Sequence, residues 1–348
     1  MKILSVGGMN GLSNTCLHRH WALEKIADEI DVVNTSGFTS LWYRIAHHLF
    51  LYGIPVRIPE NRNENAQIIE KINSTYYDIV WIDKGVTIFP ETLQYIKKKS
   101  PKTLLISYSP DNMALRHNQS QQYLECIPLY DYIITNKSYI LEDMRKLGAK
   151  DIRFVNNSYE STFHYPRTLT SEDYKEIGGD IGFVGAWEKE RCESILYLAQ
   201  HGLNVRVWGG GKWLKYKGMY PCLTIEDKGL YSENYSKSFQ AFKISLCFLR
   251  KMNFDLQTTR TVEIPACGGF MMAERTSEHQ AMFEEGKEAA FFSSNEELLE
   301  KCKYYLSHNE ERKEIATAGL KRCQTSGYSK IETLRSIINY IIKNSKKN

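Results

Sequence analysis

The stretch Leu256–Glu274, LQTTRTVEIPACGGFMMAE, decides the fold of the second half of the chain. Thr258 and Thr259 are typical of a helix start, because their hydroxyls can bind the amides that a first turn leaves unpaired. The Gly-Gly pair nine residues further on predicts the end of this short helix. The apolar run Phe270–Ala273 then predicts a buried strand. The stretch therefore predicts one helix–strand step of an α/β sheet.

The same stretch carries polar groups of three kinds on its predicted helix. Arg260, Thr261 and Glu263 supply a guanidinium, a hydroxyl and a carboxylate. Free amides and the helix dipole favour an anion at a helix start, so Thr and Arg there suit a phosphate. A carboxylate about one turn deeper suits sugar hydroxyls. This pattern outlines a nucleotide-sugar pocket, although an ordinary αβ unit with a surface Arg–Glu pair gives the same pattern.

Length and composition describe a globular protein of two ordinary domains. The 348 residues include 42% hydrophobic and 25% charged residues, and the net charge of +4 suits anionic small molecules. The eight cysteines are scattered without a C-x-x-C pair, which predicts reduced thiols in a cytoplasmic protein, with neither a zinc site nor a disulfide framework. We expect no signal peptide and no membrane-spanning segment.

The first half alternates short apolar runs with helical patterns, which predicts a parallel sheet covered by helices. Its first strand leads into the glycine loop Gly7–Gly11, where a ligand could approach the strand end. We expect a strand at Pro55–Ile58. The helix Leu41–Tyr52, LWYRIAHHLFLY, is apolar on nearly every side. We expect it to be buried between the sheet and a neighbour; the alternative is that part of it faces an apolar acceptor or a membrane.

A polar loop follows the predicted strand Thr103–Tyr108. It carries Asp111, Asn112 and Asn118. Because open α/β sheets bind ligands at the carboxyl ends of their strands, we expect this loop to contact a ligand, with a solvated connection as the alternative. Asp111 is the candidate base, or the group that orients a substrate hydroxyl.

The second half repeats the strand–glycine–helix opening of the first. Asp180–Val184 is followed by Gly185 and a helix near Trp187, and Val205–Trp208 is followed by three glycines. Such glycines let a ligand lie on the backbone. Cations stand near these predicted strand ends and would converge on one diphosphate if the strands are adjacent. These cations are Arg191, Arg250, Lys251 and Arg260.

Several segments together resemble one family of enzymes. The segment that begins TRTVEIPACGGFMMAE resembles the C-terminal domain of CgeB-like glycosyltransferases, within the GT-B group. The resemblance extends to DIGFVGAWEKER, VRVWGGG, the YSPDN loop and YDYIITNKS, and so covers most of the chain. It implies an α/β fold of two Rossmann-like domains facing across a cleft. We expect an acceptor-side domain at 1–165, a donor domain at 166–327, and a helix at 328–348 that crosses back to the first domain.

The resemblance also implies roles for individual residues. Related enzymes carry an E-x7-E pattern whose second Glu binds the donor ribose, and Glu263 stands at that place, while Asp255 replaces the first Glu. Enzymes of this group generally need no metal, and we expect neither a metal site nor a cofactor. The expected acceptor-binding residues are Gly8, Asn10, Asn112 and Asn118. The expected donor-binding residues are Gly185, Trp187, Arg191, Trp208, Gly209, Gly210, Gly211, Arg250, Lys251, Thr258, Thr259, Arg260, Thr261 and Glu263.

The sequence thus predicts a metal-independent, cytoplasmic glycosyltransferase that uses a nucleoside-diphosphate sugar. The acceptor stays open among a glycan, a protein, a small molecule and nucleic acid. Two other classes share the architecture: a nucleotide-sugar epimerase or hydrolase, and a non-catalytic nucleotide-sugar binding protein.

Overall fold

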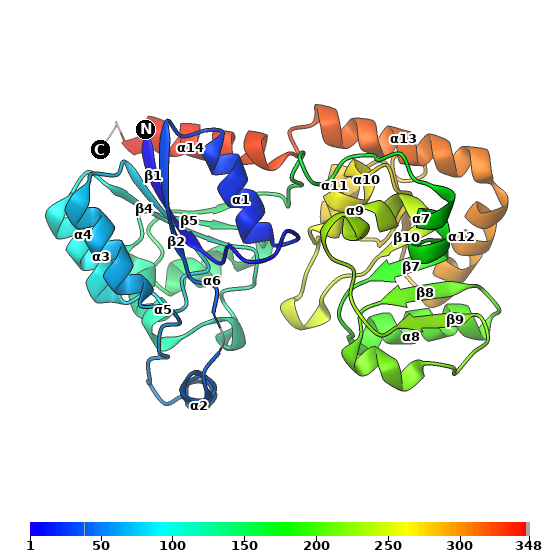
Figure 1. Cartoon of the computed structure of the whole chain (residues 1–348), viewed down its shortest axis with the longest axis horizontal. Helices are drawn as coiled ribbons and strands as arrows, with labels where there is room; N and C mark the ends of the chain where they lie inside the picture. Colours follow the sequence, from blue (N-terminus) through cyan, green and yellow to red (C-terminus); the bar gives the residue numbers. More distant parts are fainter. Residues whose placement is uncertain (38, 346–348) are drawn as a thin grey trace. The chain divides into compact units, whose positions relative to one another are not determined.

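The computed structural model describes residues 1–37 and 39–345 and divides the chain into two compact units. Unit 1 comprises residues 1–156 and 333–348, and unit 2 comprises residues 157–332. Within the described residues, each unit contains one six-stranded sheet whose paired strands run parallel (Figure 1). The α/β fold class predicted from the sequence is therefore confirmed.

The sheet of unit 1 has the order β2-β1-β3-β4-β5-β6. Three strands in the middle of this sheet, β1, β3 and β4, are buried along nearly their whole length, as expected when helices cover both faces. The strands are β1 (Lys2–Gly7), β2 (Glu29–Asn34), β3 (Ile79–Asp83), β4 (Leu104–Ser109), β5 (Tyr132–Thr135) and β6 (Ile152–Phe154). The helices of this unit are α1 (Thr15–Glu24), α2 (Leu41–Leu51), α3 (Glu64–Ser74), α4 (Pro90–Lys99), α5 (Gln121–Cys126) and α6 (Leu141–Lys146).

The sheet of unit 2 has the order β12-β11-β10-β7-β8-β9. Its strands are β7 (Gly179–Val184), β8 (Val205–Trp208), β9 (Leu223–Glu226), β10 (Phe242–Cys247), β11 (Met271–Glu274) and β12 (Ala290–Phe292). Its helices are α7 (Ser171–Ile177), α8 (Lys189–Gln200), α9 (Ser232–Ala241), α10 (Arg260–Ala266), α11 (Ser277–Met282), α12 (Asn295–Ser307) and α13 (Asn309–Thr325).

The last helix, α14 (Lys330–Ser345), begins in unit 2 and continues into unit 1. Its apolar side chains Leu334, Ile337, Ile338 and Ile341 are buried. In unit 1 the guanidinium of Arg153 stacks on the ring of Tyr340 at 3.0 Å, and the rings of Tyr132 and Tyr340 meet edge to face. These contacts make α14 part of the packing of unit 1.

Two predictions for the segment after β2 are wrong. The helix predicted to be buried, α2, buries only Ala46 and Phe50 among its residues. The strand predicted at Pro55–Ile58 is absent from the described segment, which is irregular. Pro55 lacks an N–H for a ladder, and the segment is held by a side chain: Ile58 N donates to Gln122 Oε1 at 3.1 Å, and Gln122 Nε2 donates to Ile58 O at 2.7 Å.

No helix in residues 1–37 and 39–345 combines the length and the apolar character that crossing a membrane requires.

Candidate donor and acceptor sites

The loops that follow β7 and β8 touch each other at the carboxyl edge of the unit 2 sheet. Gly185 N donates to Trp208 O at 2.9 Å, and Trp213 Nε1 donates to Gly185 O at 3.0 Å. A Cβ atom on Gly209 would lie 2.3 Å from Gly185 O. Only glycine therefore fits at position 209, and the two predicted glycine sites lie side by side.

The three consecutive glycines have different neighbours. A Cβ on Gly210 would meet Asp227 O at 2.9 Å, and Gly210 and Gly211 have φ values of +60° and +57°. At positions 209 and 210, glycine is therefore required because neighbouring backbone atoms leave no room for a side chain. Only at Gly211 would a Cβ meet nothing within 4 Å, so of the three glycines this one leaves room for a ligand.

Three guanidinium groups gather at the same edge. Arg191, on α8, is buried and donates to Ala186 O and Leu249 O, both at 3.0 Å. Arg260 Nε donates to Val184 O at 2.8 Å, and its Nη2 lies 3.4 Å from where a Cβ on Gly185 would be. Backbone carbonyls at and just after the ends of β7 and β10 therefore hold Arg191 and Arg260 in place.

The third guanidinium belongs to Arg250, and it shares a carboxylate with Arg191. Glu188 accepts from Arg250 Nε at 2.9 Å, and its other oxygen lies 3.3 Å from Arg191 Nη2. Burial lowers the pKa of Arg191 below its ordinary value; Glu188 opposes this shift, whereas the charges of Arg260 and Arg250 add to it. Arg191 is thus close enough to Arg250 and Arg260 to be repelled by both, as in a site that holds an anion.

The buried face of α10 holds a carboxylate. Glu263 is 2% exposed, and its Oε2 accepts a hydrogen bond from Tyr235 Oη at 2.6 Å. Burial raises the pKa of Tyr235 well above its ordinary value, and the charge of Glu263 adds to the shift, so the phenol keeps its proton and donates it. His164 Nε2 lies 3.5 Å from Glu263 Oε1, and burial lowers the pKa of His164 well below its ordinary value. Glu263 therefore faces a neutral imidazole and a phenol.

Other predicted donor residues are engaged inside unit 2. Thr261 Oγ1 lies 2.8 Å from His279 Nε2 and is fully buried. Thr258 N donates to Thr261 Oγ1 at 3.0 Å. Lys251 pairs with Glu274, and Thr259 precedes the first residue of α10 without a side-chain capping bond. Because α10 has only seven residues, its helix dipole is short, and the arginine side chains supply most of the positive charge at this edge.

The two predicted tryptophans have separate surroundings. Trp208 is buried, with the guanidinium of Arg206 at 4.8 Å from its ring. Trp187 packs against the core of unit 2 and has the ammonium of Lys212 at 4.8 Å from its ring. Of the two, only the partly exposed Trp187 presents ring surface to a ligand.

Unit 1 has a cavity of about 270 Å³ at the carboxyl ends of β1 and β3. Gly8, Pro110 and Asp111 are among its lining residues, so the structure brings the glycine loop and the predicted base together. Asp111 Oδ2 accepts from Lys84 Nζ at 2.7 Å. The ammonium of Lys84 is thus a further polar group at this cavity, and it competes with any hydroxyl for that carboxylate oxygen.

A buried ion pair forms one wall of the unit 1 cavity. Two nitrogens of Arg19 contact Asp83 Oδ1: Nη2 lies at 2.5 Å and Nε at 2.6 Å. Trp81 Nε1 donates to the other oxygen of Asp83 at 3.2 Å, and the Arg19 guanidinium lies 4.4 Å from the ring of Tyr108. The pair has its charges and hydrogen bonds satisfied, as a buried ion pair requires; it therefore shapes the cavity.

The remaining predicted acceptor residues bind their own loops. Asn112 Oδ1 accepts from Ala114 N at 3.1 Å, and Asn118 Nδ2 donates to Asn112 O at 3.0 Å. Asn10 N donates to Ser36 Oγ at 3.1 Å. None of the three is among the residues that line the cavity. They hold the loops that carry Gly8 and Asp111.

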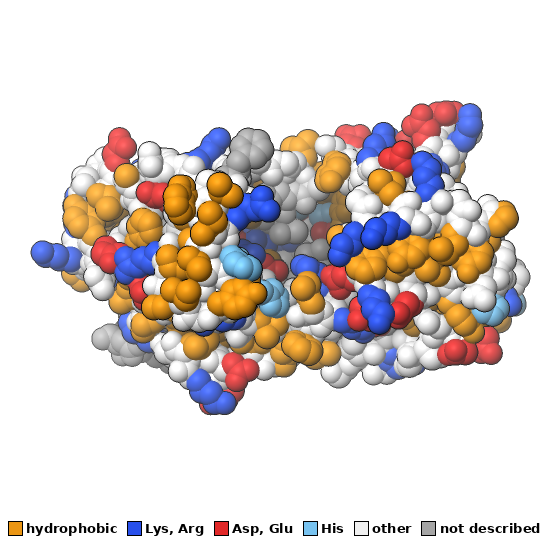
Figure 2. Space-filling view, turned by 90° about the horizontal axis from the view of Figure 1, so that it is seen from below, with side chains coloured by type: hydrophobic (Ala, Val, Ile, Leu, Met, Phe, Trp, Pro, Cys, Tyr) orange, Lys and Arg blue, Asp and Glu red, His pale blue; other side chains and the backbone are white. Residues whose placement is uncertain are grey.

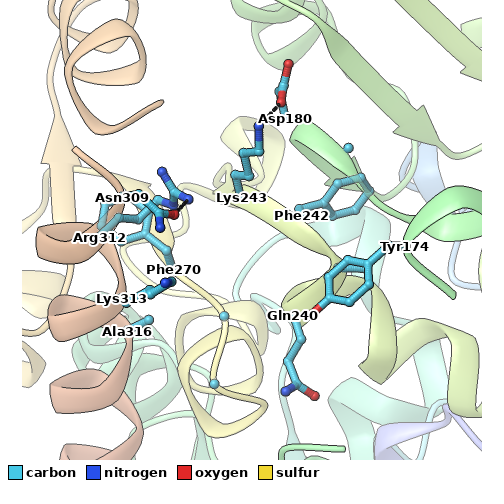
Figure 3. A pocket seen from close by; sticks show the side chains of 14 residues that line it. Tyr174, Asp180, Gln240, Phe242, Lys243, Phe270, Asn309, Arg312, Lys313 and Ala316 are labelled. Carbon is cyan, nitrogen blue, oxygen red and sulfur yellow. Dashed lines mark hydrogen bonds and ion pairs between the residues drawn. The ribbon is translucent and has the colours of Figure 1, made fainter. Parts of the chain in front are cut away.

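Unit 2 has a cavity at the amino edge of its sheet, opposite the edge that carries the predicted donor residues (Figure 3). This cavity of about 480 Å³ is lined at the amino ends of β7 and β10, by Asp180 and Phe242 among others. Lys243 points to Asp180 at 2.7 Å, and Arg312 lies beside Asn309. The predicted donor residues lie at the carboxyl edge and line no part of this cavity.

Sequence reasoning missed three groups that the structure places at these sites. Glu188 holds two of the arginines, Tyr235 holds Glu263, and Lys84 holds Asp111. Glu188 had a local signal, since it precedes Arg191 by three residues and α8 brings them together. Tyr235 and Lys84 are far along the chain from their partners and had none.

Within residues 1–37 and 39–345, no cluster of three or more His, Cys, Asp or Glu side chains is arranged to hold a metal ion.

Residues 191–338 match the family model described as glycosyl transferase-like. No curated protein sequence matches the chain. Solved structures are similar to it. HepE from Anabaena in complex with UDP-glucose is 13% identical, with 99% of this chain and 100% of that chain covered and a TM-score of 0.65. Sucrose-phosphate synthase from Thermosynechococcus elongatus is 9% identical, with 99% of each chain covered and a TM-score of 0.66. A glycosyltransferase from Rickettsia africae is similar as well (15%, 100% and 99%, TM-score 0.65).

These similarities confirm the predictions at two levels. At identities this low, the structural likeness shows the fold, which is the GT-B fold of glycosyltransferases. The match of residues 191–338 to a glycosyl transferase-like family model agrees with this fold, and together the two findings support the prediction of an enzyme of glycosyl transfer.

Proposed function

We propose that the chain is a CgeB-like glycosyltransferase that moves a sugar from a nucleoside-diphosphate sugar to an acceptor bound by unit 1. The observation that carries the proposal is the gathering of Arg191, Arg250 and Arg260 at the carboxyl edge of the unit 2 sheet. Glu188 offsets only one of these three charges, and the remaining excess of positive charge costs free energy unless a further anion binds. A diphosphate is the anion that a glycosyl donor brings.

The chemistry of transfer explains why such a cluster is needed. As the bond between sugar and diphosphate breaks, negative charge grows on the leaving group, and fixed positive groups stabilise that charge. Arg191 and Arg260 are held by backbone carbonyls, so they need little reorganisation during the reaction. This arrangement supports transfer without a metal. Gly211 and Trp187 would flank the nucleotide, and Glu263 would accept from the ribose.

The cavity of unit 1 is the proposed place of the acceptor. Asp111 would accept the proton of the attacking hydroxyl or orient it, and Lys84 would set the position of the carboxylate through its 2.7 Å contact. We place the enzyme in the cytoplasm. The eight cysteines, all within the described residues, are free thiols, as expected for a reducing compartment.

Donor binding tests the proposal directly. UDP-glucose is the first donor to try, because HepE was solved with it. A ligand that binds the folded state raises the melting temperature, so we expect a rise with UDP-glucose or another nucleoside-diphosphate sugar. Arg260→Gln should weaken that binding about 10- to 150-fold, the equivalent of one charge-assisted hydrogen bond of ~1.5–3 kcal/mol.

The matched control is Arg322→Gln, on α13, which removes a guanidinium paired with Glu288 at 2.9 Å. It should leave donor affinity unchanged. The proposal is wrong if no nucleoside-diphosphate sugar stabilises the wild type, or if both variants bind alike. Full turnover of donor in the absence of any acceptor would instead favour an epimerase or a hydrolase.

A further inference from the structure

The helix α2 turns apolar side chains toward the solvent. Leu41, Trp42, Ile45, Leu49 and Tyr52, which together we call the α2 face, are between 36% and 76% exposed. Their spacing of i, i+1, i+4, i+8 and i+11 places them on one side of a helix. Seen from below, hydrophobic and histidine side chains gather over α2 (Figure 2). A contiguous exposed apolar surface of this kind is typical of an interaction site.

The α2 face is held in position by the rest of unit 1. Ser40 Oγ accepts from Tyr43 N at 3.1 Å and so caps the helix. At the other end, Arg116 Nε donates to Phe50 O at 2.7 Å, and its guanidinium lies 4.0 Å from the Phe50 ring. The cap orders the first turn of α2, and the contacts of Arg116 tie its carboxyl end to the rest of unit 1, so the apolar side is presented outward as an ordered surface.

Positive charge borders the α2 face, and negative charge is missing from the segment around it. Arg44 and Arg116 are exposed, and neither forms an ion pair with a residue of the described ranges. The sequence has no Asp or Glu from Val32 to Pro59. Arg57, in the same segment, pairs with both Glu91 and Glu125 and so offers no positive charge to a partner. The surface that complements α2 is therefore apolar inside and anionic at its rim.

We propose that α2 docks into the interfacial layer of a membrane that contains anionic lipids. Trp and Tyr side chains prefer this layer, because it is apolar on one side and wet on the other. The aliphatic members of the α2 face would enter the acyl boundary, and Arg44 and Arg116 would meet lipid phosphates. The inference goes beyond glycosyl transfer and stands without it.

The surface of another protein would complement the α2 face less well than a membrane does. A stable interface between two proteins buries roughly 1,200–2,000 Å² in total, far more than five side chains on one short helix contribute. A helix that lies in a membrane interface needs no protein–protein contact area of this size, because its burial among lipids and its electrostatic attraction to anionic headgroups both contribute to binding. The position of α2 also fits a surface role: Tyr43, on its other side, lines the unit 1 cavity.

Vesicle sedimentation of the full chain tests the proposal. The wild type should sediment with vesicles in which phosphatidylglycerol replaces part of the phosphatidylcholine, and less with phosphatidylcholine alone. The double variant Trp42→Glu, Ile45→Glu should bind the vesicles at least about tenfold more weakly, because the two apolar side chains that would be buried in the membrane have been removed. Arg44→Gln should weaken binding to the anionic vesicles about fivefold, since one cation near such a surface contributes ~1 kcal/mol.

The matched control is Leu214→Glu, which places the same charge at an exposed leucine of unit 2. It should sediment like the wild type, and all variants should melt at the same temperature because the altered side chains are exposed. The proposal is overturned if the wild type stays in the supernatant with every vesicle, or if the double variant sediments as well as the control. It is equally overturned if the wild type is a dimer that the double variant dissociates, with no vesicle binding by either.

Discussion

Replacing Glu263 separates two roles that the structure allows for this carboxylate. In one role Glu263 accepts a hydrogen bond from the donor ribose; in the other it only braces α10 against α9 through Tyr235. The side chain is 2% exposed and already accepts one hydrogen bond at 2.6 Å. A carboxylate offers about four acceptor sites, so a ribose hydroxyl can be added to the phenol.

Glu263→Ala removes the partner of a buried phenol, and an unsatisfied buried donor costs ~1–3 kcal/mol. For a unit of this size, that loss lowers the melting temperature by about 2–12 °C. Glu263→Gln keeps a carbonyl oxygen for Tyr235, so its stability should stay close to that of the wild type. If Glu263 holds the ribose, both variants should bind UDP-glucose about 10- to 150-fold more weakly, because a charged hydrogen bond contributes ~1.5–3 kcal/mol.

Tyr235→Phe completes the experiment. This variant removes the phenol but leaves the carboxylate, so we expect a lower melting temperature with nearly unchanged donor affinity. Isothermal titration calorimetry gives the affinity, and thermal unfolding without ligand gives the stability. If folded Glu263→Gln binds the donor like the wild type, the ribose role is refuted and the brace remains.

Three further predictions concern the metal, the acceptor and the acid limb of stability. Transfer should persist in excess EDTA, because arginines replace the metal; loss in EDTA with recovery on adding magnesium or manganese would contradict this. Asp111→Asn should lower the transfer rate roughly 10²–10⁴-fold with unchanged donor affinity, and normal transfer by the folded variant would exclude the role. Arg275 lowers the pKa of Glu297, so the pair contributes stability that is complete above about pH 4.3 and is lost as the pH falls below it. Glu297→Gln should therefore melt below the wild type at pH 7 and lose less on acidification; equal losses would contradict this.

Local pattern was sufficient for most of the fold. The alternation of apolar runs and helical segments predicted most of the strands and helices in chain order, because each follows from neighbours in the sequence; β9 and the strand order within each sheet were not predicted. The burial of α2 was the main error. An apolar helix has the same sequence pattern whether it faces the core or an outside partner, and only the rest of the fold decides between them.

The candidate sites divide in the same way. Arg191 follows β7, and Arg250 and Arg260 follow β10. These two strands are neighbours in the sheet, which is the condition on which the predicted convergence depended. Their carboxylate, Glu188, and the phenol on Glu263 depend on packing between helices and loops distant in sequence. Gly209 was expected to make room for a ligand, but the clash it avoids is with Gly185 O.

The path of α14 affects how the protein forms on the ribosome. Unit 2 is one continuous stretch, residues 157–332, and can fold as soon as it has been synthesised. Unit 1 is completed only by residues 333–348, which are made after unit 2. Until then the surface that Leu334, Ile337 and Ile341 cover in the finished protein stays open to water and to chaperones. Most of unit 1 is therefore made before unit 2, yet unit 1 finishes folding after it.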